Sequence, residues 1–218
     1  MDSYNHQFID FAIKTNMLKF GKFVLKSGRI SPYFFNIGTL KNGKDLALLG
    51  HFYAQALIES GIYFDVIFGP AYKGIIVSIT TIIALTKYYN RDISYCFNRK
   101  ESKSHGEGGL LIGSSLQQGH IMLIDDVITS GDTIRESIKM IKKNKRAKLA
   151  GILIALDRQE NKNNFLFFKE LKQKYNCKIM SIVKLKDLIE YLKLKENLNF
   201  NKQLVALQLY QNIYGYDY

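Results

Sequence analysis

The chain has 218 residues, of which 47% are hydrophobic and only 2 are proline, which argues against a disordered or collagen-like chain. This length suffices for one α/β domain with a sizeable core and a small appendage. The formal net charge is +12, but lysines are frequent throughout, and their densest groups, 139–148 and 169–195, fall in helical patterns. We therefore expect no nucleic-acid partner, and a positive electrostatic field that favours small polyanionic substrates.

From residue 64 onward, short apolar runs alternate with helical patterns. Such runs predict an α/β fold with a parallel sheet covered on both faces, whose ligands gather at the carboxyl ends of the strands. The expected elements are, in chain order, a helix with Phe8, Phe11, Ala12 and Leu18 on one face, a strand at 23–26, an extended segment at 33–37 after a break at Ser31-Pro32, a helix at 45–60, a strand at 64–68, a helix at 75–87, a strand at 93–97, a polar loop at 98–113, a strand at 121–124, a helix at 133–143, a strand at 149–156, a helix at 165–175, a strand at 178–183 and helices to the C-terminus.

Nothing in the sequence predicts a secreted or membrane protein. No apolar run approaches the roughly 18 residues needed to cross a bilayer, and the first residues lack the basic-then-apolar layout of a secretory signal. Cys96 and Cys177 have no metal-ligand spacing; we expect free thiols, with a single disulfide as the alternative. The expected location is the cytoplasm, with no membrane partner.

The most informative segment begins where the 121–124 strand runs into Asp125 and Asp126. Carboxylates repel phosphate, so we expect these two to accept hydrogen bonds from vicinal ribose hydroxyls or to meet a cation. An ordinary strand-to-helix turn with acids near the helix N-terminus is the simpler alternative.

A turn of small residues follows the two acids. Thr133 and Glu136 have the spacing of a capping box, which predicts a helix beginning at this threonine. The first turn of that helix has free N–H groups that can hold a phosphate. Thr129, Ser130 and Thr133 could add hydroxyl donors, and Gly131 lets the backbone approach closely. A sugar phosphate would satisfy both halves of the segment.

Residues 124–133 resemble the phosphoribosyl pyrophosphate (PRPP) signature of the type I phosphoribosyltransferases. The resemblance implies that the acids bind ribose hydroxyls and that the loop after them binds the 5′-phosphate. One departure is Asp132, where a small or neutral residue is usual, so its charge must point away from the phosphate. The PRPP contacts expected here are Asp125, Asp126, Val127, Ile128, Thr129, Ser130, Gly131, Asp132 and Thr133.

Four further segments, 25–36, 68–74, 95–109 and 156–160, are similar to the bacterial orotate phosphoribosyltransferases, and the resemblance extends over nearly the whole chain. It implies the type I fold, a central mostly parallel sheet flanked by helices with a small N-terminal hood. It also implies a single phosphoribosyltransferase domain over 1–218, with the hood formed mainly by about residues 1–40 and the C-terminal helices packing nearby.

Arg99, Lys100, Lys103 and His105 place four potential cations in a glycine-flanked loop. Several donors together would stabilise departing pyrophosphate, and the glycines indicate a closing lid, although a solvated surface loop is the alternative. The resemblance implies that all four contact PRPP and that Lys103 and His105 assist catalysis together with Asp125 and Asp126. It implies a homodimer in which the 99–109 loop reaches the neighbouring active site. Ser104 stands where the family has Asp.

The remaining site residues also come from the resemblance. Lys26, Tyr72 and Lys73 are expected to contact PRPP, and a solvated position is the alternative for both lysines. The orotate contacts are expected to be Phe34, Phe35, Thr129 and Arg158, where the two phenylalanines could instead be core and Arg158 could instead pair with Asp157 or Glu160.

The expected reaction joins orotate to the ribose of PRPP, giving orotidine 5′-monophosphate and pyrophosphate in de novo pyrimidine biosynthesis. Mg²⁺ is expected to be carried by PRPP without direct protein ligands, with Asp125 and water as the one point of contact. Two alternatives stay open: a purine phosphoribosyltransferase with the same PRPP loop, and a PRPP-sensing regulator that binds nucleic acid.

Overall fold

A computed structural model describes residues 3–25, 28–103, 109–128, 131–143, 145–160, 162–195 and 200–216; for 102, 103, 109 and 162–167 it describes the backbone alone. The elements are α1 (Tyr4–Lys14), β1 (Leu18–Val24), β2 (Ile30–Phe35), the 3-10 turn η1 (Ile37–Thr39), α2 (Gly43–Glu59), β3 (Val66–Phe68), α3 (Lys73–Tyr89), β4 (Ser94–Lys103), β5 (Gly109–Gly113), β6 (Gln118–Val127), α4 (Asp132–Lys142), β7 (Arg146–Asp157), α5 (Lys162–Tyr175), β8 (Lys178–Lys184), α6 (Leu185–Leu194) and α7 (Asn201–Tyr214).

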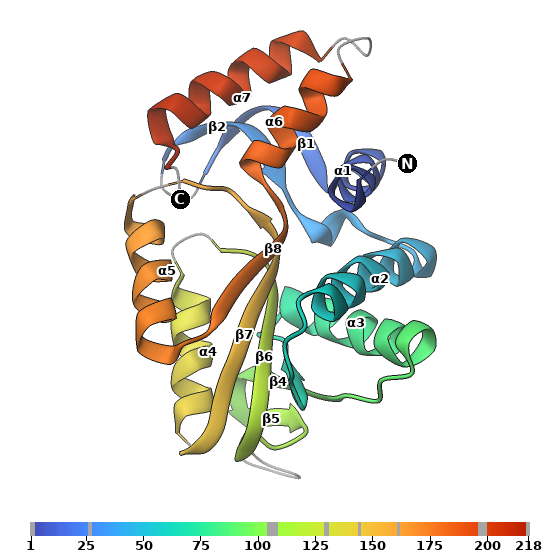
Figure 1. Ribbon diagram of the computed structural model, residues 1–218, viewed down its shortest axis with the longest axis vertical. Coiled ribbons are helices and arrows are strands. Elements are labelled where there is room, and N and C mark those ends of the chain that lie inside the picture. Colours follow the sequence, from blue (N-terminus) through green and yellow to red (C-terminus); the bar gives the residue numbers. More distant parts are fainter. Residues whose placement is uncertain are drawn as a thin grey trace.

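The centre of the molecule is a six-stranded sheet in the order β5-β4-β3-β6-β7-β8. β3, β4, β6, β7 and β8 pair in parallel, and β5 joins β4 in antiparallel fashion at the edge. Helices α2 and α3 lie on one face of the sheet and α4 and α5 on the other (Figure 1). The predicted mostly parallel sheet with helices on both faces is confirmed.

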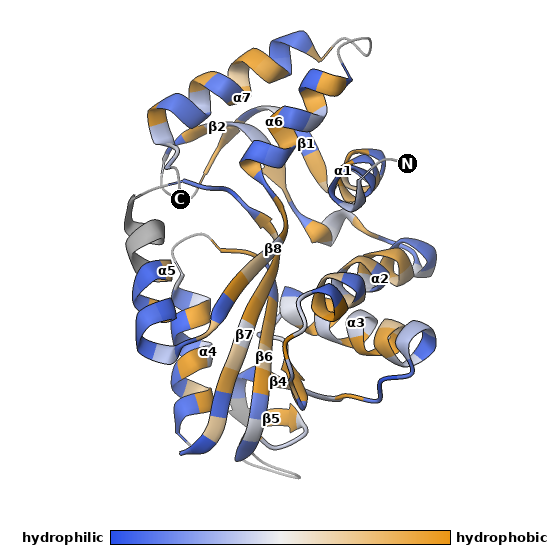
Figure 2. Cartoon of the chain, viewed as in Figure 1, coloured by the Kyte–Doolittle hydropathy of each residue, from blue (hydrophilic) through white to orange (hydrophobic). Residues whose placement is uncertain are grey.

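The two faces of the sheet bury separate cores because side chains alternate along a strand. On β6, Met122 and Ile124 belong to the core on the α2–α3 side, whereas Ile121 and Leu123 belong to the core on the α4 side. The middle parts of the central strands are therefore apolar on both faces, while the helices are apolar on one side (Figure 2).

A second, two-stranded antiparallel sheet of β1 and β2 lies beyond the carboxyl ends of the large sheet, together with α6 and α7 (Figure 1). Helix α7 packs against β2 and α6, and α1 packs against α6 and β8. Segments from the two ends of the chain thus cover the end of the sheet where ligands of this architecture bind.

Three expectations about local structure are wrong. Leu18 lies in β1 and not on the opening helix, because Asn16 takes a left-handed conformation (φ 60°) that ends the helical path. Strand β2 runs through Pro32 without a break, since the outer side of a two-stranded sheet needs no N–H donor. Much of the expected 98–113 loop is the β4–β5 hairpin, whose polar composition reflects an edge of the sheet.

Cys96 and Cys177 are both free and buried, so the disulfide alternative is wrong. Burial raises the pKa of the Cys96 thiol to about 12, which keeps it protonated. Among the described helices, none is both long and apolar enough to cross a bilayer.

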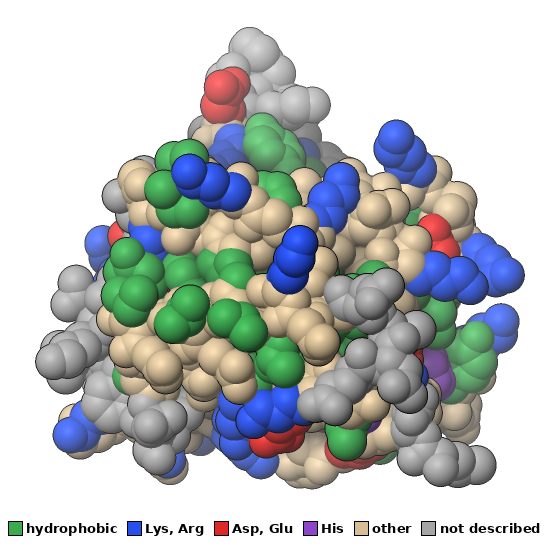
Figure 3. Space-filling view, turned by 90° about the horizontal axis from the view of Figure 1, so that it is seen from above, with side chains coloured by type: hydrophobic (Ala, Val, Ile, Leu, Met, Phe, Trp, Pro, Cys, Tyr) green, Lys and Arg blue, Asp and Glu red, His purple; other side chains and the backbone are tan. Residues whose placement is uncertain are grey.

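The outer face of α7 is partly apolar, because Val205, Leu209 and Ile213 follow one another at four-residue spacing and are exposed. Seen from this end of the molecule, hydrophobic side chains form a visible group, and lysine and arginine side chains are scattered among them (Figure 3). The positive charge on this face is therefore distributed.

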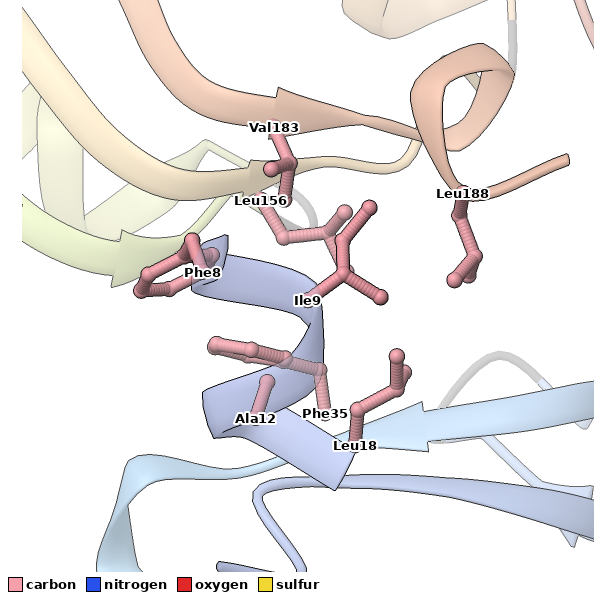
Figure 4. A pocket seen from close by; sticks show the side chains of 8 residues that line it. All are labelled: Phe8, Ile9, Ala12, Leu18, Phe35, Leu156, Val183 and Leu188. Atoms are coloured by element: carbon pink, nitrogen blue, oxygen red, sulfur yellow. The ribbon is translucent and has the colours of Figure 1, made fainter. Parts of the chain in front are cut away.

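The core under α1 contains a small apolar cavity of about 10 Å³, which is no more than the space of one water molecule (Figure 4). Helix α1 thus fits tightly against the sheet and the pair β1–β2. The side chains that line the cavity are Phe8, Ile9, Ala12, Leu18, Phe35, Leu156, Val183 and Leu188.

We expect Phe8→Ala to lower the free energy of unfolding by about 3–5 kcal/mol, because Phe8 is fully buried and its ring lies 5.1 Å from that of Phe52. Denaturation by urea measures this, with Ile213→Ala as the control, since that side chain is 70% exposed. A loss no larger than that of the control would contradict the packing described for α1.

Candidate functional site

Asp125 and Asp126 end the buried part of β6 and are 8% and 5% exposed. Each carboxylate accepts a hydrogen bond from the backbone N–H of the next residue: Asp126 N lies 2.9 Å from Asp125 Oδ1, and Val127 N lies 2.9 Å from Asp126 Oδ1. The hydroxyl of Tyr53 donates to the carbonyl oxygen of Asp125 at 2.8 Å, which fixes the backbone at this point. The strand thus holds two acids in fixed positions.

The two acids differ in electrostatics. The Nζ of Lys73 lies 2.7 Å from Asp126 Oδ2, so Asp126 has a cationic partner. Burial, and next the charge of Asp126, raise the pKa of Asp125 to about 7. Near neutral pH, Asp125 can therefore hold a proton, and it becomes a full acceptor when a ligand supplies donors or positive charge.

Lys73 is placed by the turn between β3 and α3. At Gly69, a β-carbon would lie 2.1 Å from the carbonyl oxygen of Gly74, so only glycine lets the turn pack onto the start of the helix. The Oδ1 of Asn98 on β4 accepts from the N–H of Ala71 at 3.0 Å. Tyr72, next to the lysine, is 70% exposed. Since β3 is the neighbour of β6, the turn delivers Lys73 directly to the acids.

Helix α4 begins at Asp132, and Gly131 is its N-cap in the left-handed conformation (φ 80°). The predicted capping box of Thr133 and Glu136 is wrong, because the turn at Gly131 starts the helix earlier and puts Thr133 inside its first turn. The Asp132 carboxylate is 75% exposed and lies 3.7 Å from Arg135. The free N–H groups of this turn can hold an anion.

Val127 and Ile128 bury their side chains, the first partly and the second to 5% exposure, so their contribution to any ligand is limited to the backbone. The hairpin residues Arg99 and Lys100 lie on β4, two strands from β6. The Nζ of Lys100 lies 5.8 Å from the centre of the Tyr72 ring, so this cation faces the turn that carries Lys73.

The aromatic pair of β2 points in two directions. Phe35 is 5% exposed and packs into the core beside Phe8, so the alternative of a core position is confirmed for this side chain. Phe34 is 39% exposed and stacks on Phe23 with ring centres 5.5 Å apart. Only the ring of Phe34 is therefore available to a ligand, and Phe35 can offer backbone groups.

Arg158 follows β7 and is 8% exposed. Its Nη2 lies 2.7 Å from Glu160 Oε1 and 2.9 Å from Ser31 Oγ, and its guanidinium carbon lies 4.1 Å from the centre of the Tyr33 ring. The alternative of a salt bridge to Glu160 is thus confirmed. Burial acts to lower the pKa of Arg158, but Tyr33 and Glu160 outweigh it, so the guanidinium stays charged.

Comparison with known proteins decides the family. A family model described as the phosphoribosyl transferase domain matches residues 36–178. Orotate phosphoribosyltransferases of Erwinia tasmaniensis and Salmonella paratyphi A are 55% and 54% identical over 216 residues, which is 99% of this chain and 100% of each relative. The chain belongs to the orotate phosphoribosyltransferase family.

The fold agrees with the family. A crystal structure of the orotate phosphoribosyltransferase of Francisella tularensis matches with a TM-score of 0.83 at 39% identity, over 96% of this chain and 100% of that one. The Mycobacterium tuberculosis enzyme in complex with PRPP is 16% identical, with a TM-score of 0.62 over 85% of this chain, and shares the fold. The expectation of a type I phosphoribosyltransferase fold is confirmed.

Several expected site residues lie outside the described part of the chain: Lys26, His105, Thr129 and Ser130, together with the side chain of Lys103. Ser104, which stands where the family has Asp, also lies outside it. The structure adds Tyr53, Asn98, Ser31 and Tyr33, which were not predicted. Their signal in the sequence is weak, because each acts on a residue far along the chain. Ser31 and Arg158, for example, are 127 positions apart.

Because the pKa of Asp125 is raised to about 7, the ligand-free protein should lose stability as pH rises. An unfolded aspartate titrates near pH 4, so above about pH 4 the folded chain holds a proton that the unfolded chain has released. The free energy of unfolding should therefore fall, by at most about 1.4 kcal/mol per pH unit, until about pH 7, where the stabilisation is lost.

The variant Asp125→Asn should flatten this dependence, since an amide stays neutral throughout. Urea denaturation without PRPP, at several pH values between about 5 and 8, measures the slope. Asp132→Asn is the matched control and should keep the slope of the natural sequence, because Asp132 is exposed. An unchanged slope in Asp125→Asn would refute the pKa assigned to this carboxyl.

Proposed function

We propose that the chain catalyses transfer of the 5-phosphoribosyl group from PRPP to orotate, giving orotidine 5′-monophosphate and pyrophosphate. The observation that carries this is the identity of 54% or more to orotate phosphoribosyltransferases over 99% of the chain. The ionised ring nitrogen of orotate forms a bond to the anomeric carbon while the bond from that carbon to pyrophosphate oxygen breaks, and the leaving group takes the electron pair. Because the nitrogen is already anionic, no strong general base is required.

In this proposal, the PRPP half of the site lies between β3, β6 and α4. Asp125 and Asp126 accept hydrogen bonds from the ribose hydroxyls, and the turn 127–133 donates backbone N–H groups to the 5′-phosphate. What supports this is the placement of two buried acids directly before a helix N-terminus. Thr129 and Ser130 would add hydroxyl donors, as predicted from the sequence.

Lys73 and the hairpin are proposed to hold the pyrophosphate. Lys73 is the described cation nearest the acids, 2.7 Å from Asp126, and its side chain is 44% exposed, so it can turn to a phosphate when the ribose occupies Asp126. Arg99, Lys100, Lys103 and His105 would stabilise the leaving group from the hairpin, and Lys26 and Tyr72 would complete the contacts with PRPP.

Mg²⁺ is proposed to arrive bound to PRPP oxygens. Among the described residues, no three His, Cys, Asp or Glu side chains lie close enough to hold a metal ion, and Asp126 already has a cationic partner, so the residues present fit an ion coordinated mainly by substrate and water. Asp125 would meet the ion through water. Bound there, Mg²⁺ would neutralise part of the pyrophosphate charge.

The orotate half is proposed to lie between β2 and the end of β7. The ring of Phe34 would cover one face of orotate, the backbone of 34–35 would meet its polar edge, and Arg158 would bind its carboxylate or a ring carbonyl, with Thr129 touching both substrates. What supports this is the meeting of β2 and Arg158 through Ser31. A location in the cytoplasm and the absence of a nucleic-acid partner stay predictions.

The substrate test is direct: with PRPP and Mg²⁺, the protein should consume orotate and form orotidine 5′-monophosphate. A purine phosphoribosyltransferase would instead consume hypoxanthine, adenine or guanine, and each loss can be followed by ultraviolet absorbance. Turnover of a purine with no turnover of orotate would reverse the assignment. Tight, steeply salt-dependent binding to DNA with no turnover of any base would favour the regulator.

The lid proposal predicts that Lys103→Ala lowers kcat by about a hundredfold, which is typical for loss of one group that stabilises transition-state charge. Steady-state kinetics with orotate and PRPP measures this, with Lys139→Ala on the exposed side of α4 as the control. Turnover within a few-fold of the natural sequence would contradict the role of the lysine.

The homodimer and its exchanged loop can be tested by mixing Lys103→Ala with Asp126→Asn. If the loop acts in the neighbouring site, a hybrid dimer has one site with both an intact loop and intact acids, and random exchange restores about a quarter of full activity. If each loop serves its own site, every site keeps one defect and the mixture stays as inactive as its components.

A further inference from the structure

The four residues after the apolar part of β7 are all polar and all buried. Asp157, Arg158, Gln159 and Glu160 are exposed by 8%, 8%, 4% and 7%. Charged side chains are rarely buried unless they are paired, so this segment must be held by its neighbours. Its partners come from the beginning and the end of the chain, and Glu160 has the largest share of them.

Glu160 contacts three side chains. Its Oε1 lies 2.7 Å from Arg158 Nη2 and accepts a hydrogen bond of 3.3 Å from the hydroxyl of Tyr33, while its Oε2 lies 3.1 Å from Arg29 Nη1. One carboxylate therefore stands between two guanidinium groups. The second guanidinium is held from its other side, since Arg29 lies over the ring of Tyr214 at 4.6 Å.

These contacts fix the orientation of Arg158. Its Nη2 is bound by Glu160 and by Ser31 Oγ, and the Tyr33 ring covers one face of its guanidinium. An arginine side chain otherwise loses considerable rotamer freedom when it binds a ligand. Because Nη2 and one face of the guanidinium are already held, the group keeps one orientation before a ligand arrives.

We propose that Glu160 is a positioning residue for orotate recognition, acting through Arg158. This rests on the proposed function, in which Arg158 binds orotate. Glu160 also connects Arg158 to β2, the strand that contains Phe34, because it accepts a hydrogen bond from Tyr33; Arg158 itself contacts the same strand at Ser31. The carboxylate thereby fixes Arg158 relative to the backbone of β2, and PRPP, held by β3, β6 and α4, does not depend on it.

Glu160→Ala should raise KM for orotate about tenfold or more, with KM for PRPP and kcat changed less than threefold. Glu160→Gln keeps the shape and one acceptor oxygen, so it should recover part of the affinity for orotate. The control is Arg29→Gln, which removes the other ion pair of Glu160 but leaves the contact with Arg158, and KM for orotate should stay within about twofold. If Arg29→Gln raises KM as much as Glu160→Gln, or if both substrates lose affinity equally, the junction is only structural and the proposal is wrong.

A double-mutant cycle with Arg158→Ala separates this inference from the proposed function. If Glu160 acts through Arg158, adding Glu160→Ala to Arg158→Ala should raise KM for orotate by less than twofold further. Additive losses would overturn the inference while leaving Arg158 in its place. If Arg158→Ala alone leaves KM for orotate unchanged, the orotate role of Arg158 fails instead. Thermal unfolding of every variant shows whether it is folded at the assay temperature. If Glu160→Ala is unfolded there, Glu160→Gln replaces it in the cycle.

Discussion

Parallel pairing of β6 with β3 on one side and with β7 on the other is the constraint on which the site depends. Parallel strands end at the same edge of a sheet, so the turns after β3, β6 and β7 open side by side. This places Lys73, the two acids and Arg158 in one row, although they come from three separate parts of the sequence. The apolar side chains that bury both faces of β6 hold this row in register.

Such a row requires burying charge, which is unfavourable unless each group is paired. The two halves of the site meet this requirement differently. Asp126 pairs with Lys73, whose side chain is 44% exposed, and Asp125 holds a proton more readily because its pKa is raised. Arg158 and Glu160 pair with each other, their side chains are 9% and 8% exposed, and the ring of Tyr33 covers the guanidinium. The first half can exchange partners with a ligand, and the second is preformed.

The sequence predicts features that depend on neighbouring residues and misses those that depend on distant ones. The apolar run before Asp125 suffices to predict a buried strand ending in two acids. The helix start at Asp132 was missed by one residue, because the positive φ of Gly131 outweighs the preference of Thr133 for the N-cap. The predicted break at Pro32 is wrong because proline interrupts central strands, which need its missing N–H, whereas β2 pairs on one side only.

Contacts across the chain follow from the topology and have no local pattern. The pairing of Lys73 with Asp126 exists because β3 adjoins β6, and nothing near either residue states that order. The contacts of Arg158 with Ser31 and Tyr33 likewise require β2 to lie over the end of β7. The same junction is reached from the C-terminus, since Gly215 bridges to Glu160 and the Tyr216 N–H donates to the Gln159 carbonyl. Both ends of the chain therefore converge on the segment that holds Arg158, and this makes the arrangement around Arg158, where we propose that orotate binds, a property of the whole fold.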